Sequence, residues 1–127
     1  MLRSTLGPLG LGLTLLGGAV LGVVVTEPSA LAQSGPPIGG TYSSHGTNPN
    51  GSTYTGTVVI RPDGGRYYFS WLIANGDTFK GTGTRDGDTV VVAWGSKYPV
   101  IYQVGADGIL HGKWANGKAS ETLVPQK

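Results

Sequence analysis

Glu121 is the ionisable residue whose place in the sequence most suggests chemistry. It lies two residues before Leu123 in a strand-like segment, so the two side chains share one face. If Leu123 faces the core, the carboxylate needs donors there, from Tyr or Trp side chains of neighbouring strands or from Lys113 or Lys118. Two interpretations stay open: a polar anchor at the base of a ligand cup, and a strand-end residue whose carboxylate reaches solvent.

Aromatic side chains are numerous for a chain of this size, which has 3 Trp, 6 Tyr and 2 Phe. The interior of a small β-barrel is filled by side chains, so we expect most of these rings in the core. The alternative is an aromatic mouth that stacks on a sugar, a peptide or a small hydrophobic molecule. The candidate ligand-binding residues are therefore Glu121, Trp71, Trp94, Trp114 and Tyr102.

Signatures of catalysis and of metal binding are absent from the sequence. It has no cysteine, no G-x-S-x-G nucleophile motif and no H-E-x-x-H zinc motif. His45 and His111 fall on different predicted strands, and a shared metal site would need further ligands. We therefore expect both imidazoles at the surface of a protein that is not an enzyme and holds no metal or cofactor.

Turn-forming pairs divide the second half of the chain into short segments with the composition of β-strands. Asn-Gly and Asp-Gly favour type I′ hairpin turns, and loops this short join antiparallel neighbours. The turn signals are Asn50-Gly51, Asp63-Gly64-Gly65, Asn75-Gly76, Asp86-Gly87, Gly95-Ser96, Asp107-Gly108 and Asn116-Gly117. The predicted fold is all-β, a small eight-stranded antiparallel up-and-down (meander) barrel with strands at 41–45, 52–61, 66–74, 77–85, 89–94, 98–104, 109–115 and 119–124.

Alternation along the strands at 52–61, 66–74 and 77–85 assigns their residues to an inner or an outer face. Thr, Ser, Lys and Arg side chains fall on the outer face. The inner face takes Tyr54, Gly56, Val58 and Ile60, then Tyr67, Phe69, Trp71 and Ile73, then Phe79, Gly81 and Gly83. Inner glycines leave space for bulky neighbours and let the strands coil tightly. An even number of strands in meander order brings the last beside the first, so the sheet can close.

The segments 89–94 and 98–104 are apolar on both faces. Either the end of the barrel or the preceding tether covers their outer face, or Val91 and Ile101 belong to an exposed strip. In the second case Val91 and Ile101 form an interface with a protein partner or with a second copy of the chain.

Residues 1–32 have the features of a signal peptide. Arg3 precedes an uncharged apolar stretch at 6–25, and Ala30 and Ala32 form an A-x-A cleavage site. A retained N-terminal anchor is the alternative. After cleavage no membrane span remains, so we expect a periplasmic or secreted protein.

The remaining chain divides into a Pro/Gly tether at 33–40, expected to be extended and solvated, and one barrel domain at 41–126. The net charge of +2 is small and its basic residues are scattered, which argues against nucleic-acid binding. Without cysteine the domain has no disulfides, so burial and strand pairing must stabilise it.

Several segments of the mature chain form a pattern typical of known proteins. They are Gly40-Thr41-Tyr42, the run from Gly46 to Gly56, Phe69-x-Trp71, Phe79-x-Gly81-x-Gly83, Gly108-x-Leu110-x-Gly112-x-Trp114 and Glu121-x-Leu123-x-Pro125. With them the chain resembles small exported proteins of Gram-negative bacteria, uncharacterised or labelled fibronectin-binding. The meander also resembles avidin and lipocalin barrels, at the level of fold only. Neither resemblance transfers site residues to this chain.

The function that we expect is a non-catalytic exported binding module of the bacterial cell envelope. Its partner would be a protein or a small hydrophobic or sugar ligand, held on a rigid β scaffold. A self-associating structural envelope protein is the alternative. A third class is an enzyme that acts from an enclosed pocket through Glu121, His111 or a Tyr.

Overall fold

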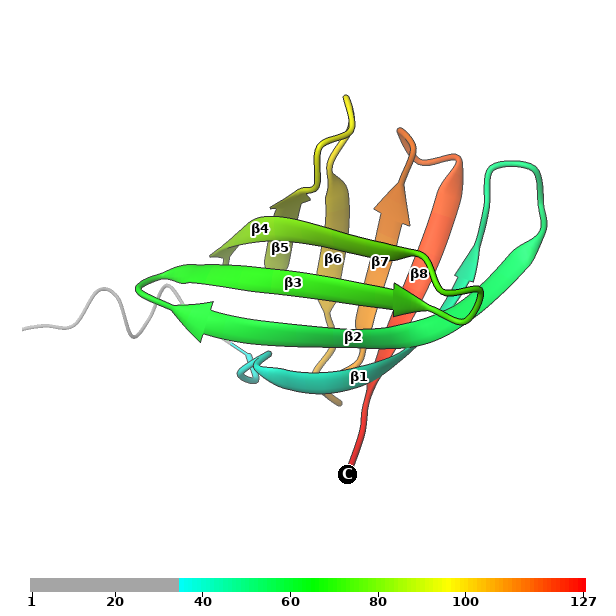
Figure 1. Ribbon diagram of the computed structural model, residues 1–127. Coiled ribbons are helices and arrows are strands. Elements are labelled where there is room, and N and C mark those ends of the chain that lie inside the picture. Colours follow the sequence, from blue (N-terminus) through cyan, green and yellow to red (C-terminus); the bar gives the residue numbers. More distant parts are fainter. Residues whose placement is uncertain (1–34) are drawn as a thin grey trace, which may run out of the picture. The chain divides into compact units, whose positions relative to one another are not determined.

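The computed structural model describes residues 35–127, which form a closed antiparallel barrel (Figure 1). Its strands are β1 (Gly40–Thr47), β2 (Thr53–Asp63), β3 (Arg66–Ile73), β4 (Thr78–Asp86), β5 (Thr89–Ala93), β6 (Val100–Val104), β7 (Leu110–Trp114) and β8 (Ala119–Pro125). Each strand pairs with the next, and β1 also pairs with β8. The predicted fold class is confirmed. The predicted signal peptide lies outside the described residues.

The inner face predicted from alternation is the observed core. Val58, Ile60, Phe69 and Trp71 are each at most 6% exposed. Phe79 is the exception, with 40% of its surface exposed, because it lies near the start of β4 at one end of the barrel.

No helix among residues 35–127 is long and apolar enough to cross a membrane.

The inner glycines leave space for aromatic and branched neighbours, as predicted. A Cβ on Gly81 would lie 2.8 Å from Val92 Cγ1 and 3.1 Å from Trp71 Cη2. A Cβ on Gly83 would lie 3.2 Å from Phe69 Cε1. A side chain at either position would therefore displace the core residues of the adjacent strands.

The turns lie where they were predicted, but most are not of type I′. Between β2 and β3, Gly64 and Gly65 both have positive φ, at 60° and 87°, as a type I′ turn requires. In residues 35–127, Asn116 is the one Asn or Asp with positive φ. At the other Asn-Gly and Asp-Gly pairs the glycine alone has positive φ, which is typical of other short hairpin turns.

The outer surface carries apolar side chains on β5 and β6. Val91 and Ile101 lie directly opposite each other and are 40% and 41% exposed. The tether therefore does not bury them, and the first interpretation of this apolar face is wrong. His45 and His111 are also exposed, as the alternation predicted.

Candidate ligand-binding site

Glu121 lies in the middle of a row of residues that crosses neighbouring strands. The register places Tyr54 opposite Gly46, Gly46 opposite Glu121, Glu121 opposite Gly112, and Gly112 opposite Tyr102. A tyrosine thus lies two strands away on each side, with a glycine between. Strands are about 4.8 Å apart, so each tyrosine starts about 10 Å from the glutamate backbone. A phenol and a glutamate side chain can span that distance together.

The two intervening glycines allow each tyrosine ring to lean toward the carboxylate. A Cβ on Gly46 would overlap the Tyr54 ring, and a Cβ on Gly112 would lie 2.7 Å from Tyr102 Cδ1. The rings therefore occupy the space in which side chains at these positions would lie. Across the sheet, the residues of this row are Tyr, Gly, Glu, Gly and Tyr. They come from five different strands, so the row cannot be read from neighbouring positions in the sequence.

The Glu121 carboxylate is buried, at 4% exposure, and accepts four hydrogen bonds. Oε1 accepts from Ser44 Oγ at 2.9 Å and from Tyr54 Oη at 2.9 Å. Oε2 accepts from Trp71 Nε1 at 3.1 Å and from Tyr102 Oη. An ionised carboxylate has about four acceptor positions, so the protein's own donors fill them.

These donors are all neutral groups. Neither of the ion pairs among residues 35–127 involves Glu121. Lys113 and Lys118, considered above as donors, are exposed instead. The interpretation of Glu121 as a solvent-reaching strand-end residue is wrong, because closure of β8 against β1 and β7 encloses the carboxylate.

Burial and the Glu121 carboxylate keep the neighbouring phenols protonated. Burial raises the pKa of Tyr54, and the carboxylate charge and its hydrogen bond raise it further. The same causes, in the same order, raise the pKa of Tyr102 well above 10.0. Both hydroxyl groups therefore remain donors to the carboxylate over the whole physiological pH range.

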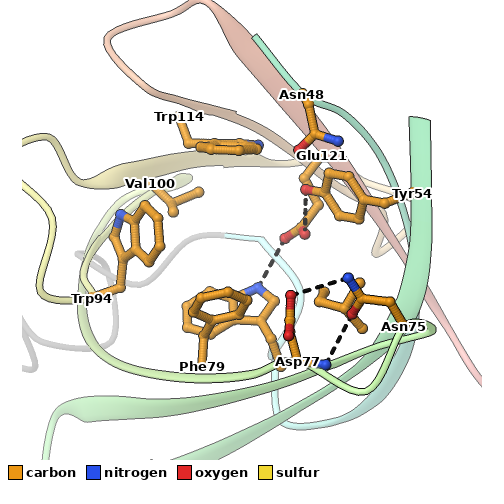
Figure 2. A pocket seen from close by; sticks show the side chains of 11 residues that line it. Asn48, Tyr54, Asn75, Asp77, Phe79, Trp94, Val100, Trp114 and Glu121 are labelled. Carbon is orange, nitrogen blue, oxygen red and sulfur yellow. Dashed lines mark hydrogen bonds between the residues drawn. The ribbon is translucent and has the colours of Figure 1, made fainter. Parts of the chain in front are cut away.

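A pocket of ≈ 180 Å³ reaches Glu121 from one end of the barrel (Figure 2). It opens among the β1–β2, β3–β4, β5–β6 and β7–β8 connections, which all lie at that end. The lining residues are Asn48, Tyr54, Trp71, Ile73, Asn75, Asp77, Phe79, Trp94, Val100, Trp114 and Glu121. Most of this wall is aromatic or aliphatic, with a few polar groups, as in small-molecule sites.

Four aromatic rings of the pocket are joined by edge-to-face contacts. Tyr54 and Trp114 have ring centroids 6.3 Å apart at an angle of 68°. Trp114 and Trp94 are 6.0 Å apart at 88°, and Trp94 and Phe79 are 5.8 Å apart at 79°. Figure 2 shows these rings around a common space that the Glu121 carboxylate faces. The contacts hold the rings in place without a ligand.

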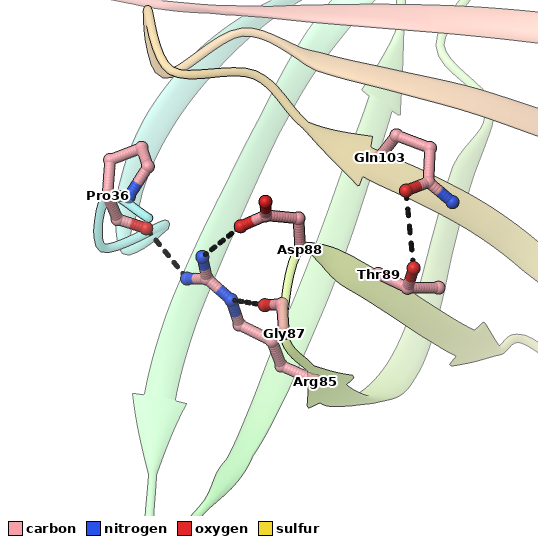
Figure 3. Close-up of polar contacts among 6 residues, drawn as sticks. All are labelled: Pro36, Arg85, Gly87, Asp88, Thr89 and Gln103. Carbon is pink, nitrogen blue, oxygen red and sulfur yellow. Dashed lines mark hydrogen bonds and ion pairs between the residues drawn. The ribbon is translucent and has the colours of Figure 1, made fainter. Parts of the chain in front are cut away.

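The end of the barrel opposite the pocket is closed by residues 35–39. Ile38 is 1% exposed and joins the core, and its carbonyl oxygen accepts a hydrogen bond from Tyr42 Oη at 2.6 Å. Arg85 Nη1 donates to the carbonyl oxygen of Pro36 at 2.7 Å (Figure 3). The predicted solvated tether is therefore wrong at Ile38, because the barrel interior takes up its apolar side chain.

The structure brings some of the predicted site residues together. Trp71 and Tyr102 both bind Glu121, while Trp94 and Trp114 line the pocket around it. Tyr102 is fully buried and supports the carboxylate from behind, without lining the pocket. The interface candidates Val91 and Ile101 lie on the outer surface, apart from this site.

Sequence reasoning missed several residues of the site. Ser44 was not singled out, and it is a fully buried donor to Glu121. Asn48, Asn75 and Asp77 line the pocket from turns whose Asn-Gly signals had been assigned to turn geometry alone. Ser44 lies two residues after Tyr42, so the two side chains share the inner face of the strand. A polar residue on an inner face needs a hydrogen-bond partner, and this signal could have identified Ser44 as a donor.

The chain matches no protein-family model and no curated protein. Among solved structures it is similar to a redesigned beta barrel, with 23% identity over 71% of this chain and 92% of that chain and a TM-score of 0.50. It is also similar to a redesigned beta barrel, mFAP0, bound to DFHBI. That match has 24% identity over 68% of this chain and 97% of that chain, with a TM-score of 0.47. At this identity the likeness shows the barrel fold alone. The resemblance to exported bacterial proteins stays a prediction.

Proposed function

We propose that the protein is a non-catalytic, exported binding protein whose barrel holds a small organic ligand in the aromatic pocket over Glu121. The observation that carries the proposal is a pocket closed at its base by a fully hydrogen-bonded carboxylate and walled by aromatic rings held in place by one another. Such a site is formed before the ligand arrives, which lowers the entropic cost of binding.

The dimensions of the pocket suit a small ligand. Its ≈ 180 Å³ is close to the roughly 150 Å³ of an engineered apolar cavity that binds benzene. A protein partner would need a far larger contact area than this mouth offers. A ligand of roughly six to twelve non-hydrogen atoms fits the space.

A binding role also agrees with the state of the ionisable groups. A general base needs a free oxygen within reach of a substrate proton, whereas both Glu121 oxygens accept from the protein's own donors. Tyr54 and Tyr102 have raised pKa values because of burial and the adjacent carboxylate, so neither phenol is activated as a base near neutral pH. Export rests on the signal-peptide pattern of residues 1–32 and is tested by mass spectrometry of the mature N-terminus.

Intrinsic tryptophan fluorescence provides the test, because all 3 Trp of the chain line the pocket. We expect a library of small organic molecules to contain compounds that shift this fluorescence saturably. Trp114→Phe, at the mouth, should weaken their binding, while Leu72→Ala, on the outer face, should not. If no compound produces a saturable shift, or if both variants weaken binding equally, the pocket is not the binding site.

The second candidate function is self-association through the apolar strip of Val91 and Ile101. What favours it is that these two exposed side chains are cross-strand partners, so they form one continuous apolar surface. Val91 and Ile101 lie on the outer face of the barrel, whereas the pocket lies inside it, so self-association and ligand binding are compatible.

A further inference from the structure

We infer that the pocket selects a small organic cation that carries a quaternary ammonium group. This inference rests on the proposed ligand-binding function and names the chemical class of the ligand. It follows from four features of the pocket: its charge, the engagement of most of its donors within the protein, the filled acceptor positions of Glu121, and the arrangement of its rings.

The charge of the pocket is negative. Glu121 and Asp77 both line it, and its other lining residues include no Lys, Arg or His. Glu121 accepts hydrogen bonds from neutral hydroxyl and indole groups and takes part in no ion pair among residues 35–127, so no cation of the described chain neutralises its charge. In a partly enclosed site of low effective dielectric, this charge attracts a cationic ligand and repels an anion.

The donors that line the pocket are mostly engaged within the protein. Trp71 Nε1 donates to Glu121, Trp94 Nε1 to the Tyr98 carbonyl oxygen at 3.0 Å, and Trp114 Nε1 to the Ser120 carbonyl oxygen at 3.4 Å. Anions and sugars are recognised through several free donors. The indoles therefore present ring faces and edges to the ligand, with their N–H groups turned to the protein.

The acceptor positions of Glu121 are also occupied. Ser44 and Tyr54 bind one oxygen, and Trp71 and Tyr102 the other. At the base of the pocket, a primary ammonium group would bring N–H donors that lose water and find no free acceptor position on Glu121, which is costly. The other carboxylate of the pocket, Asp77, is exposed and accepts a hydrogen bond from Asn75 Nδ2, so an ammonium group bound there would stay in contact with water. A quaternary ammonium group has no N–H to satisfy, so it responds to the charge of Glu121 without needing its lone pairs.

The rings complete the site. Tyr54, Trp114, Trp94 and Phe79 are related by interplanar angles of 68°, 88° and 79°, so successive rings are steeply inclined around one space. Aromatic faces arranged in this way attract quaternary ammonium ions by cation–π interaction, as in the cages that bind choline and methylated lysine. The volume of ≈ 180 Å³ accommodates a trimethylammonium group with a short substituent.

The test compares three probes with the full chain: choline, its neutral carbon isostere 3,3-dimethylbutan-1-ol, and ethanolamine. Binding is followed by tryptophan fluorescence and by titration calorimetry. We expect choline to bind at least about tenfold more tightly than the neutral isostere, because the two differ in charge and not in shape. Ethanolamine should bind more weakly than choline.

Variants separate the contributions of the rings and the carboxylate. Phe79→Leu keeps an apolar side chain at an exposed position and removes a ring, so it should reduce choline affinity about fivefold and leave the isostere unchanged. Glu121→Gln should bring the two affinities together. If this variant fails to fold, Phe79→Leu still decides, and Leu72→Ala serves as the control on the outer face.

The outcomes distinguish this inference from the proposed function. Equal affinity for choline and the isostere overturns the cation preference and leaves a small-ligand site. If choline does not bind while other small molecules shift the tryptophan fluorescence, the cation preference is likewise overturned and a small-ligand site remains. If neither choline nor any other small molecule binds, both the inference and the proposed function are wrong.

Discussion

The ring of Tyr102 lies over the Cα of Gly112, on the adjacent strand, and reaches past it to the Glu121 carboxylate. A Cβ on Gly112 would be 2.7 Å from both Cδ1 and Cε1 of that ring. Gly112 does not have a positive φ, so its backbone conformation does not by itself require glycine. The close approach of Tyr102 is therefore the reason for glycine at this position.

Gly112→Ala is expected to lower the free energy of unfolding by about 1–3 kcal/mol, because the added methyl group displaces the Tyr102 ring. Chemical denaturation measures the change. In a Tyr102→Leu background the same substitution should cost less than about 1 kcal/mol, since the ring is gone. A cost that is equal in the two backgrounds would show that the Tyr102 contact is not the cause.

Trp71→Ala is expected to cost about 3–5 kcal/mol of unfolding free energy. Trp71 is 6% exposed, stacks on Phe69 with ring centroids 5.4 Å apart, and donates to Glu121. Phe79→Ala is the matched control, because that ring is 40% exposed, and it should cost no more than about 1.5 kcal/mol. Thermal and chemical unfolding give both values. Equal losses would contradict the assigned burial.

Alkaline pH is expected to destabilise the fold. Burial raises the pKa of Tyr42, Tyr54 and Tyr102 above the usual 10.0, while the unfolded chain keeps the usual value. Above pH 10.0 the unfolded state releases protons that the folded state retains, so this part of the stability is full below that pH and declines above it. Phenolate absorbance should show these tyrosines titrating only as the protein unfolds.

The same titration has an internal control. Tyr54→Phe and Tyr102→Phe should each reduce the steepness with which stability falls above pH 10.0. Phe79→Leu, which removes a partly exposed ring that has no hydroxyl group, should leave that steepness at the parent value. A fold whose stability is independent of alkaline pH would contradict the burial of these hydroxyl groups.

Val91→Lys tests the apolar strip. If the strip joins two copies of the chain, light scattering should show an oligomer for the parent and a monomer for the variant. The variant should keep its unfolding free energy within about 0.5 kcal/mol, because Val91 is exposed. Thr55→Lys, at an exposed position on β2, is the control. An unchanged mass for Val91→Lys rejects self-association through this strip.

The local sequence was enough to predict the strands and, where apolar and polar residues alternate, their inner faces. Turn residues such as Asn75-Gly76 mark where one strand ends and the next begins, and alternation along Tyr67, Phe69 and Trp71 identifies the face of the strand that packs in the core. These features depend on residues close together in the chain. For the same reason the inner position of Glu121 followed from Leu123 two residues later.

The surroundings of Glu121 were decided by tertiary structure. Ser44 lies 77 residues away, and it reaches the carboxylate because β1 pairs with β8. No hairpin turn sets the register of that pairing. It depends on how far the strands are staggered when the whole sheet closes, which is a property of the barrel and of no single segment. The sequence therefore determined that Glu121 shares a face with Leu123, and closure of the barrel determined that the carboxylate is enclosed and which donors and rings it meets.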